Sequence, residues 1–330
     1  MATFEKRPGV WRVKIRQRGV SRSASFRTKA QAQAWAAMVE AEIVAGRLGE
    51  MPDKSLRELL ERYRDEVTVG KRGERPERLR IEAFLRDDEL VRVQLGALSP
   101  ADIEGWMRRR LKSVQPGTVL RDVHILSHAC NMAIRWGWLR ENPVSSAVKP
   151  AEPAPRGRRV SQDEIDRLLL ACGYEYDVAP ETATARVGAA FLFALETAMR
   201  SGEICALTWE NVDLNRRVAH LPMTKNGHAR VVPLSKEAVR LLEQMKQVRD
   251  EGAPVFRLTD ANRDALFRKI RARAMVDGLH FHDTRREALT RMAAKVDVMT
   301  LAKISGHRDL RILQNTYYAP DMGDVASRLD

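Results

Sequence analysis

The stretch LHFHDTRREALTRMA, residues 279–293, carries a histidine and an arginine at the predicted beginning of a helix. Asp283 or Thr284 can start this helix, which places His282 at its mouth and Arg285 three residues further on. Free backbone N–H groups at a helix N-terminus attract anions, and both side chains add to that attraction. His280 and His282 would suit a metal, but no third ligand of suitable type stands nearby. The stretch therefore favours an anion site.

Two further cations lie upstream, in segments with defined predicted structure. Residues 188–206, GAAFLFALETAMRSGEICA, predict one apolar helix in which Arg200 and Glu203 share a face. This spacing fits an internal salt bridge, or an arginine that its glutamate aims into a site. Apolar segments flank Thr224–His228, whose Asn-Gly dipeptide predicts a β-hairpin with Lys225 at its tip. A lysine at a turn is usually only solvated, so Lys225 by itself is weak evidence for a ligand site.

The C-terminal segment LAKISGHRDLRILQNTYYAP, residues 301–320, adds a histidine and two adjacent tyrosines. His307 follows Gly306 and is predicted to stand at the start of a helix that leads to Tyr317 and Tyr318. Neighbouring residues on a helix point about 100° apart, so only one of the two hydroxyl groups can face the cations.

These side chains suit the cleavage of a phosphodiester by a phenol. The transition state carries extra negative charge on the non-bridging oxygens, which two arginines can bind bidentately. A histidine can take or return the phenol proton, and a lysine can protonate the leaving 5′ oxygen. The covalent phosphotyrosine conserves the bond energy, so the strand can be rejoined. This chemistry requires no metal and no nucleotide cofactor.

Four segments in this order resemble the motifs of the tyrosine recombinase family, specifically the phage-type integrases. They are TAMRSGE (197–203), TKNGHARVVPL (224–234), HDTR (282–285) and SGHRDL (305–310). Each motif is weak alone, but all four in order before a tyrosine are highly specific, and the resemblance covers nearly the whole chain. It implies a multidomain, mainly α protein with small β-sheets and a mixed α+β catalytic domain.

The resemblance also implies a role for each candidate residue. Two arginines would bind the scissile phosphate, the lysine would be the general acid for the leaving oxygen, and the first histidine the general acid/base. The second histidine would hydrogen-bond to the phosphate. Arg200 and Arg285 are the two arginines, and Lys225 is the lysine. His282 is the first histidine and His307 the second.

The position of the nucleophile departs from the family's pattern. The family usually has its tyrosine nine residues after the last histidine, where this chain has Thr316. Tyr317 and Tyr318 lie ten and eleven residues after His307. An insertion of one residue is the smallest change that restores the family's spacing, and it selects Tyr317 as the nucleophile. Tyr318 is then expected to pack or to touch a neighbouring subunit.

The N-terminal segment is the most basic part of the chain, with nine Lys/Arg and one acid in its first 30 residues. Apolar residues alternate there with Arg12, Lys14 and Arg16, which predicts a strand with one apolar and one cationic face. Ser21–Phe26 can return as a second strand, and residues 30–45 predict a helix behind the sheet. Cations without interleaved acids favour phosphate contact over a merely solvated face.

The remaining chain divides at a basic, proline-rich segment. Residues 55–147 predict almost entirely helices, one of them from Thr118 to about Trp138 with Arg121 on its polar side. KPAEPAPRGRR, residues 149–159, predicts a stiff linker. The resemblance implies four parts: an arm-type DNA-binding module (1–50), a helical core-binding domain (55–147), the linker (148–160) and the catalytic domain (161–330).

Composition agrees with a nucleic-acid partner. The 330 residues carry a net charge of +13 and a pI of about 10.0, which favours a polyanion. Three well-separated cysteines without metal spacing fit unpaired thiols in a reducing cytosol. The chain has no signal-like start and no run of about 18 apolar residues, so we expect the bacterial cytoplasm and no membrane.

The resemblance implies that double-stranded DNA attachment sites are the substrate, recombined by a homotetramer through a Holliday junction without a cofactor. A directionality factor and a DNA-bending protein are further expected partners. A type IB-like topoisomerase uses similar chemistry, but the arm module and the motif spacing argue against it. A non-catalytic DNA-binding regulator would need cations but no tyrosine, and a host chromosome-dimer resolvase would not need the arm module.

Overall fold

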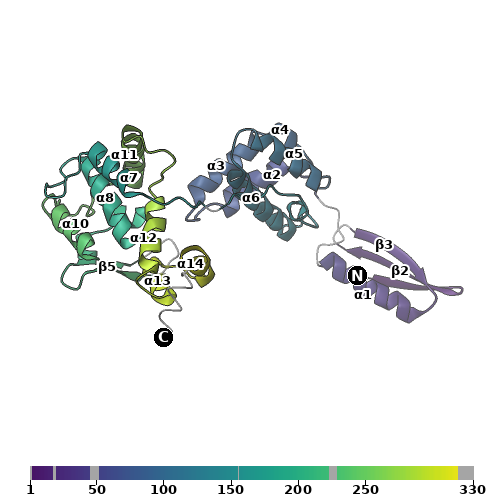
Figure 1. Ribbon diagram of the computed structural model, residues 1–330. Helices are drawn as coiled ribbons and strands as arrows, with labels where there is room; N and C mark the ends of the chain where they lie inside the picture. The colour runs from purple at the N-terminus through teal and green to yellow at the C-terminus, as the bar shows by residue number, and fades with distance from the viewer. Residues whose placement is uncertain (1, 18–19, 45–51, 155, 223–228, 319–330) are drawn as a thin grey trace, which may run out of the picture. The chain divides into compact units, whose positions relative to one another are not determined.

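Figure 1 shows the computed structural model of the chain, which describes residues 2–17, 20–44, 52–154, 156–222 and 229–318. The chain divides into two compact units, Met1–Pro155 and Arg156–Asp330. Among the described residues, no helix is both long and apolar enough to cross a membrane.

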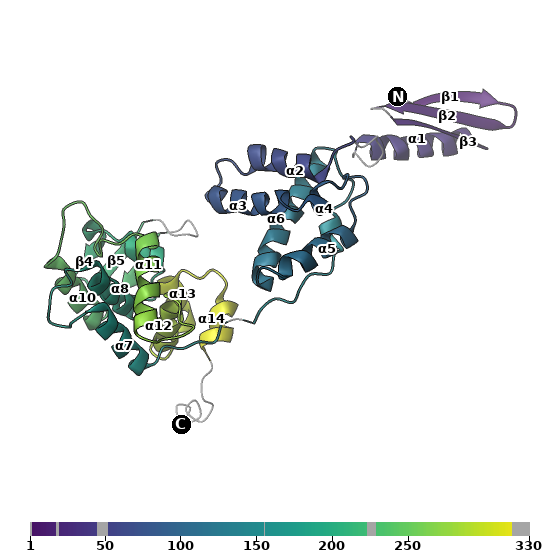
Figure 2. The same ribbon diagram turned by 90° about the horizontal axis from the view of Figure 1, so that it is seen from above.

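The first unit begins with an antiparallel sheet backed by a helix, as Figure 2 shows from above. Val13 and Ile15 are fully buried and pack with residues of the helix in one apolar cluster. Because strand residues alternate between faces, Arg12, Lys14 and Arg16 lie on the opposite face of the sheet. The elements are β1 (Ala2–Arg7), β2 (Val10–Gln17), β3 (Val20–Phe26) and α1 (Lys29–Val44).

The sequence predicted β2, β3 and α1 but not β1. The β1 segment ATFEKR carries only two apolar residues toward the helix, Ala2 and Phe4, so its alternation is too short to recognise. It pairs with β2 along its whole length, from Ala2 opposite Ile15 to Arg7 opposite Val10.

The rest of the first unit is helical, as predicted. Ser55 opens its first helix with a capping box to Glu58, and Pro116 occupies the first turn of its longest helix. That helix therefore begins two residues before the predicted Thr118. The elements are α2 (Leu56–Arg62), the π-helix η1 (Tyr63–Val67), α3 (Glu74–Leu85), α4 (Asp88–Val91), α5 (Pro100–Leu111), α6 (Pro116–Arg135) and the short η2 (Pro143–Ser145).

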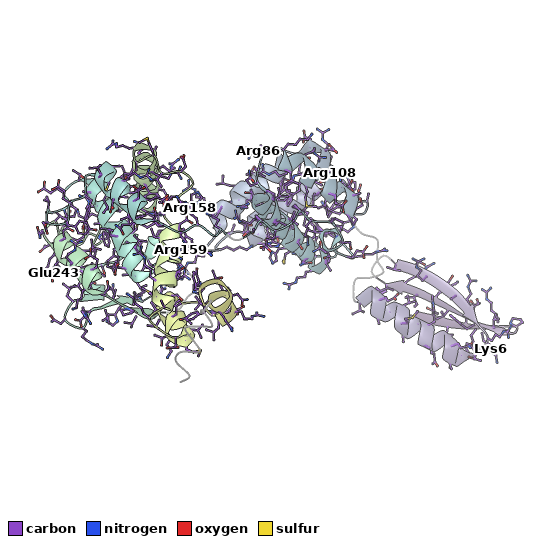
Figure 3. All side chains as sticks on the ribbon, viewed as in Figure 1. Lys6, Arg86, Arg108, Arg158, Arg159 and Glu243 are labelled. Atoms are coloured by element: carbon purple, nitrogen blue, oxygen red, sulfur yellow. The ribbon has the colours of Figure 1, made fainter. Side chains whose placement is uncertain are left out.

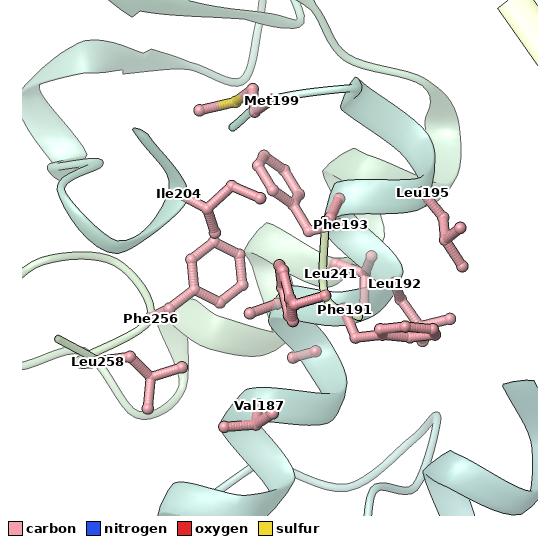
Figure 4. Packing of buried hydrophobic residues seen from close by; sticks show 14 of the residues in the cluster. Val187, Phe191, Leu192, Phe193, Leu195, Met199, Ile204, Leu241, Phe256 and Leu258 are labelled. Atoms are coloured by element: carbon pink, nitrogen blue, oxygen red, sulfur yellow. The ribbon is translucent and has the colours of Figure 1, made fainter. Parts of the chain in front are cut away.

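The second unit is built around one buried helix, α8 (Figure 4). Almost every residue of α8 from Val187 to Leu195 is buried, because α7, α10, α11 and α12 all contact it. Phe193 and Phe256 lie with ring centroids 5.1 Å apart in this core. The helices are α7 (Gln162–Cys172), α8 (Ala183–Thr197), α9 (Ser201–Cys205), η3 (Trp209–Asn211), α10 (Lys236–Lys246), α11 (Asp260–Arg273), α12 (Asp283–Ala293), α13 (Val298–Ser305) and α14 (Leu310–Tyr317).

A small antiparallel sheet completes the second unit. It consists of β4 (Val212–Asp213), β5 (Val218–Leu221) and β6 (Arg230–Pro233), in that order. β5 and β6 are the two strands of the predicted hairpin, and Val232 of β6 pairs with Ala219 of β5. The hairpin tip, residues 223–228, lies outside the described residues.

The prediction of one continuous helix over residues 188–206 is wrong. α8 ends at Thr197, Ala198 adopts a left-handed conformation with φ 53°, and α9 begins at Ser201 with Arg200 as its N-cap. Alanine favours helices and carries no break signal, so the sequence gives no warning of this turn. The break matters because it creates the surroundings of two predicted site residues.

Candidate active site

Arg285 is held by the carboxyl ends of two helices. Its Nη1 donates to the Ala198 carbonyl, at the end of α8, at 2.5 Å. Its Nη2 donates to the Ser305 carbonyl, at the end of α13, at 2.6 Å. Terminal helix carbonyls have no partner within their own helix and carry partial negative charge, so they suit a cation. Two of the five guanidinium N–H groups are thereby used, which fixes the plane of a side chain only 4% exposed.

The environment of Arg285 is strongly cationic. Burial, together with the charges of Arg200 and Arg230, lowers the pKa of Arg285 to about 10. The guanidinium therefore stays charged at neutral pH, but it lies where an anion would relieve repulsion among neighbouring cations.

Glu203 binds two of these arginines at once. Arg230 donates to both of its carboxylate oxygens, at 2.7 and 2.6 Å. Arg200 donates through its backbone N–H at 2.8 Å and through Nη1 at 3.0 Å. Burial alone would raise the pKa of the Glu203 carboxyl, but the hydrogen bonds from Arg230 and Arg200 hold it below its usual range. The predicted Arg200–Glu203 pair is therefore present, with Arg200 as helix cap rather than mid-helix.

Arg230 is a site residue that the sequence reasoning missed. Its side chain is 7% exposed, and its Nε donates to the Ile304 carbonyl at 2.9 Å, next to the Ser305 carbonyl that binds Arg285. The one available signal is the period of two in this strand, which places Arg230 on the same face as the buried Val232. Gly306 has φ 73° and lies so close that an added Cβ would be 3.2 Å from Arg230 Cδ.

His307 lies in the turn between α13 and α14, not at the start of a helix as predicted. α14 begins three residues later, at Leu310, and Asp309 caps it. The Nδ1 of His307 is 2.7 Å from the Ser305 hydroxyl. Burial, followed by the charges of Arg285, Arg200 and Arg230, lowers the pKa of His307 to about 4. The imidazole is therefore neutral at neutral pH.

The two adjacent tyrosines lie in different environments. Both pack against the apolar cluster of Leu289, Leu301 and Leu313. The Tyr318 hydroxyl donates to the Val296 carbonyl at 2.5 Å. Tyr317 is half-buried beside α12 instead. Burial raises the pKa of Tyr317, whereas the positive charges of Arg286 and Arg285 on α12 lower it. Only Tyr317 of the pair thus faces the arginines.

His282 lies at the start of α12, and the hairpin tip that carries Lys225 is not part of the described chain. His282 is the N-cap of α12, at the mouth of the helix as predicted, and its side chain is exposed. Lys225 lies outside the described residues. The side chains brought together are those of Arg200, Arg285, His307 and Tyr317, joined by Glu203 and Arg230.

The basic linker end is bound to the second unit. Arg159 donates to both carboxylate oxygens of Glu287, at 2.5 and 3.1 Å, and Arg156 donates to Asp283 at 3.1 Å. Arg158, labelled with Arg159 in Figure 3, pairs with Glu164 at 2.5 Å. Glu287 and Asp283 lie on α12, two residues after and two before Arg285. Arg156 and Arg159 thus contact the helix that carries the site.

The cations predicted to contact DNA outside this group lie at or near the surface. Lys14 and Arg16 are exposed and Arg12 is half-buried on the sheet face away from α1, and Arg121 is exposed on α6. Within the described ranges, no group of three or more His, Cys, Asp or Glu residues could hold a metal.

Comparisons with known proteins point in one direction. Residues 158–323 match the model of the phage integrase family. An integrase/recombinase homologue of Haemophilus influenzae is 47% identical over 329 residues, covering 98% of this chain and 89% of the relative. The shufflon-specific DNA recombinase of Escherichia coli is 36% identical over 287 residues, covering 84% and 72%.

Similarity in structure extends over most of the chain. A lambda integrase tetramer bound to a Holliday junction superposes with a TM-score of 0.66 at 17% identity, covering 94% of this chain and 93% of that one. At this identity the likeness concerns the fold, a multidomain, mostly helical tyrosine recombinase fold with small antiparallel sheets. The chain belongs to the phage integrase family and is a tyrosine recombinase.

Proposed function

We propose that the chain cuts and rejoins double-stranded DNA at specific attachment sites through a 3′-phosphotyrosine on Tyr317. The observation that carries this choice is the difference between the two tyrosines. Tyr317 lies beside Arg285, in the same group as Arg200 and His307. The Tyr318 hydroxyl is engaged by the Val296 carbonyl.

Cleavage would begin with attack of the Tyr317 Oη on the scissile phosphorus. A bond forms between the phosphorus and the Tyr317 Oη as the bond from phosphorus to the 5′ oxygen breaks, and the phosphate stays joined to the DNA strand through the 3′ oxygen. The phenol proton passes to His282, and Lys225 supplies a proton to the departing 5′ oxygen. Rejoining is the reverse, with a 5′ hydroxyl of the partner strand as nucleophile.

The buried cations would stabilise the charge that develops on the phosphate. Arg285 retains three N–H groups beyond the two that bind helix carbonyls, and Arg200 retains donors beyond its bond to Glu203. His307 is neutral, and with its proton on Nε2 it would donate to a phosphate oxygen while Nδ1 accepts from Ser305. Glu203 and Arg230 keep this set in place.

The other parts of the chain would hold the DNA. Residues 1–50 serve as the arm-type DNA-binding module, 55–147 as the core-binding domain, 148–160 as the linker and 161–330 as the catalytic domain. We further propose a homotetramer on paired attachment sites in the bacterial cytoplasm, assisted by a directionality factor and a DNA-bending protein.

A trapping experiment tests this proposal. The protein is incubated with nicked duplexes tiled across the DNA that flanks its gene, so that cleavage releases a short strand and the covalent adduct accumulates. Wild type and Tyr318→Phe should form an adduct on one sequence, and Tyr317→Phe should form none. The opposite pattern would make Tyr318 the nucleophile. No adduct with wild type would support a regulator, and supercoil relaxation without sequence preference would support a topoisomerase.

A further inference from the structure

Arg286 follows Arg285 on α12 and lies beside Tyr317. Neighbouring helix residues point about 100° apart, so the two guanidinium groups reach different partners. Arg285 reaches the helix carbonyls of Ala198 and Ser305, whereas the Cζ of Arg286 lies 5.9 Å from the centroid of the Tyr317 ring. Arg286 is not among the site residues predicted from the sequence.

The half-buried Arg286 side chain forms no ion pair within the described residues. Its Nε is buried and without a hydrogen bond. Arg263 also has a buried, unbonded Nε, but its terminal nitrogens pair with Asp260 and Asp264 at 3.0 Å. In the described part of the chain, no carboxylate pairs with Arg286. The half-buried Arg286 thus places a cation without a bound carboxylate beside the proposed nucleophile.

We propose that Arg286 is a positioning residue for Tyr317, whose cation holds the ring and stabilises the negative charge that grows on the phenol oxygen during attack. This inference rests on Tyr317 being the nucleophile. Before reaction the cation has no counter-charge, and during attack the phenol oxygen becomes one. The stabilisation is therefore greater in the transition state than in the ground state, as catalysis requires.

The electrostatics of Tyr317 agree with this geometry. Burial raises the pKa of the phenol, and Arg286, followed by Arg285, opposes that rise. Arg285 is assigned to the scissile phosphate, and Arg286 is the cation that lies against the Tyr317 ring. The other charged or titratable groups of the site surround Arg285 or Tyr318 instead; they are Arg200, Glu203, Arg230, His307 and Asp297.

Two variants of the full-length protein test the inference. Arg286→Met removes the charge and keeps an unbranched apolar side chain, so folding should be preserved because no ion pair of the described residues is lost. Arg286→Lys keeps the charge. Single-turnover adduct formation is measured from pH 6 to pH 10 on the nicked duplex, alongside DNA affinity and thermal unfolding.

We expect Arg286→Met to slow adduct formation at pH 7 by about tenfold or more, because the phenol oxygen loses the cation that stabilises its developing negative charge. The deficit should shrink as pH rises, Arg286→Lys should keep most of the wild-type rate, and DNA affinity should not change. The same deficit should persist on a 5′-bridging phosphorothiolate, whose leaving group needs no proton.

Other outcomes would overturn the inference. A loss of DNA affinity with an unchanged single-turnover rate would make Arg286 a phosphate contact. A deficit that is equal at all pH values and not restored by lysine would make it merely structural. If Arg286→Met does not fold, Arg286→Gln takes its place. A pH profile of adduct formation by Arg286→Gln equal to that of wild type would overturn the inference. No adduct with wild type would contradict the proposed function, whereas normal adduct formation by Arg286→Met would contradict this inference alone.

Discussion

Glu203→Gln is the substitution that most directly tests the electrostatic design of the site. Among the described residues, the Glu203 carboxylate is the one negative charge bound to Arg200 and Arg230, and it lies among cations that also include Arg285. Glutamine has nearly the same shape and keeps an oxygen acceptor, but it removes the charge. The variant therefore leaves the buried cations without their compensation.

The expected cost follows from burial and geometry. The side chains of Glu203 and Arg230 are 9% and 7% exposed and form two hydrogen bonds, at 2.7 and 2.6 Å. Removal of one partner from such a buried pair costs about 3–5 kcal/mol in the free energy of unfolding. Glu243→Gln is the matched control, because Glu243 (labelled in Figure 3) is 51% exposed and lies 3.8 Å from Lys246. An exposed pair of this kind contributes about 0–1 kcal/mol.

Hydrogen exchange of the slowest amides in α8 provides the measurement, because these amides exchange when the core of the second unit opens. Glu203→Gln should lower their protection by about 3–5 kcal/mol, and Glu243→Gln should leave it nearly unchanged. Adduct formation should be slowed in Glu203→Gln alone. Equal protection in the two variants would refute the view that Glu203 is needed to compensate the buried arginines.

The pH dependence has a definite sign. The folded-state pKa of Glu203 is lowered, so its stabilisation is present above the ordinary glutamate value and is lost as pH falls through the folded value. Wild type should therefore lose stability in this acid range more steeply than Glu203→Gln, which lacks the titrating group. Parallel acid unfolding curves for the two proteins would contradict this sign.

Two further predictions concern packing and DNA affinity. Gly188→Ala would place a Cβ 2.6 Å from the Cys172 sulfur in the core, so we expect a loss of about 1–3 kcal/mol in the same exchange measurement, and unchanged protection would contradict the close packing. Replacement of Arg12, Lys14 and Arg16 by glutamine should reduce the slope of log affinity against log salt by about 2.7 on arm-type DNA, at about 0.9 for each lost phosphate contact; an unchanged slope would exclude contact by this sheet face.

Sequence reasoning predicted one site with Arg200, Arg285, His307 and Tyr317, because few residue types can perform this chemistry and the motifs stand in order. It missed Arg230 because an arginine on a short hairpin strand looks solvated until the strand is packed on α13. Arg286 was missed for a related reason. Arg286 lies beside Tyr317 because α14 packs against α12, and no local sequence pattern predicts this packing.

The same limit applies to the fold. Capping boxes and the proline at residue 116 mark helix starts through local chemistry, so those starts could be predicted. The break after Thr197 could not, because Ala198 is held in its left-handed conformation by tertiary contacts, including the bond from Arg285 to its carbonyl. The linker segment was predicted only to be stiff and basic, because the carboxylate partners of Arg159 and Arg156, Glu287 and Asp283, lie over 120 residues away along the chain.

Identification of the tyrosine that carries the DNA tests the central claim most directly. The adduct trapped on a nicked duplex is digested with nuclease and trypsin, which leaves a nucleotide remnant on the peptide Ile312–Arg328 that contains both tyrosines. Fragmentation of this peptide in a mass spectrometer should place the remnant on Tyr317. A remnant on Tyr318, or on any residue outside the peptide, would contradict the account.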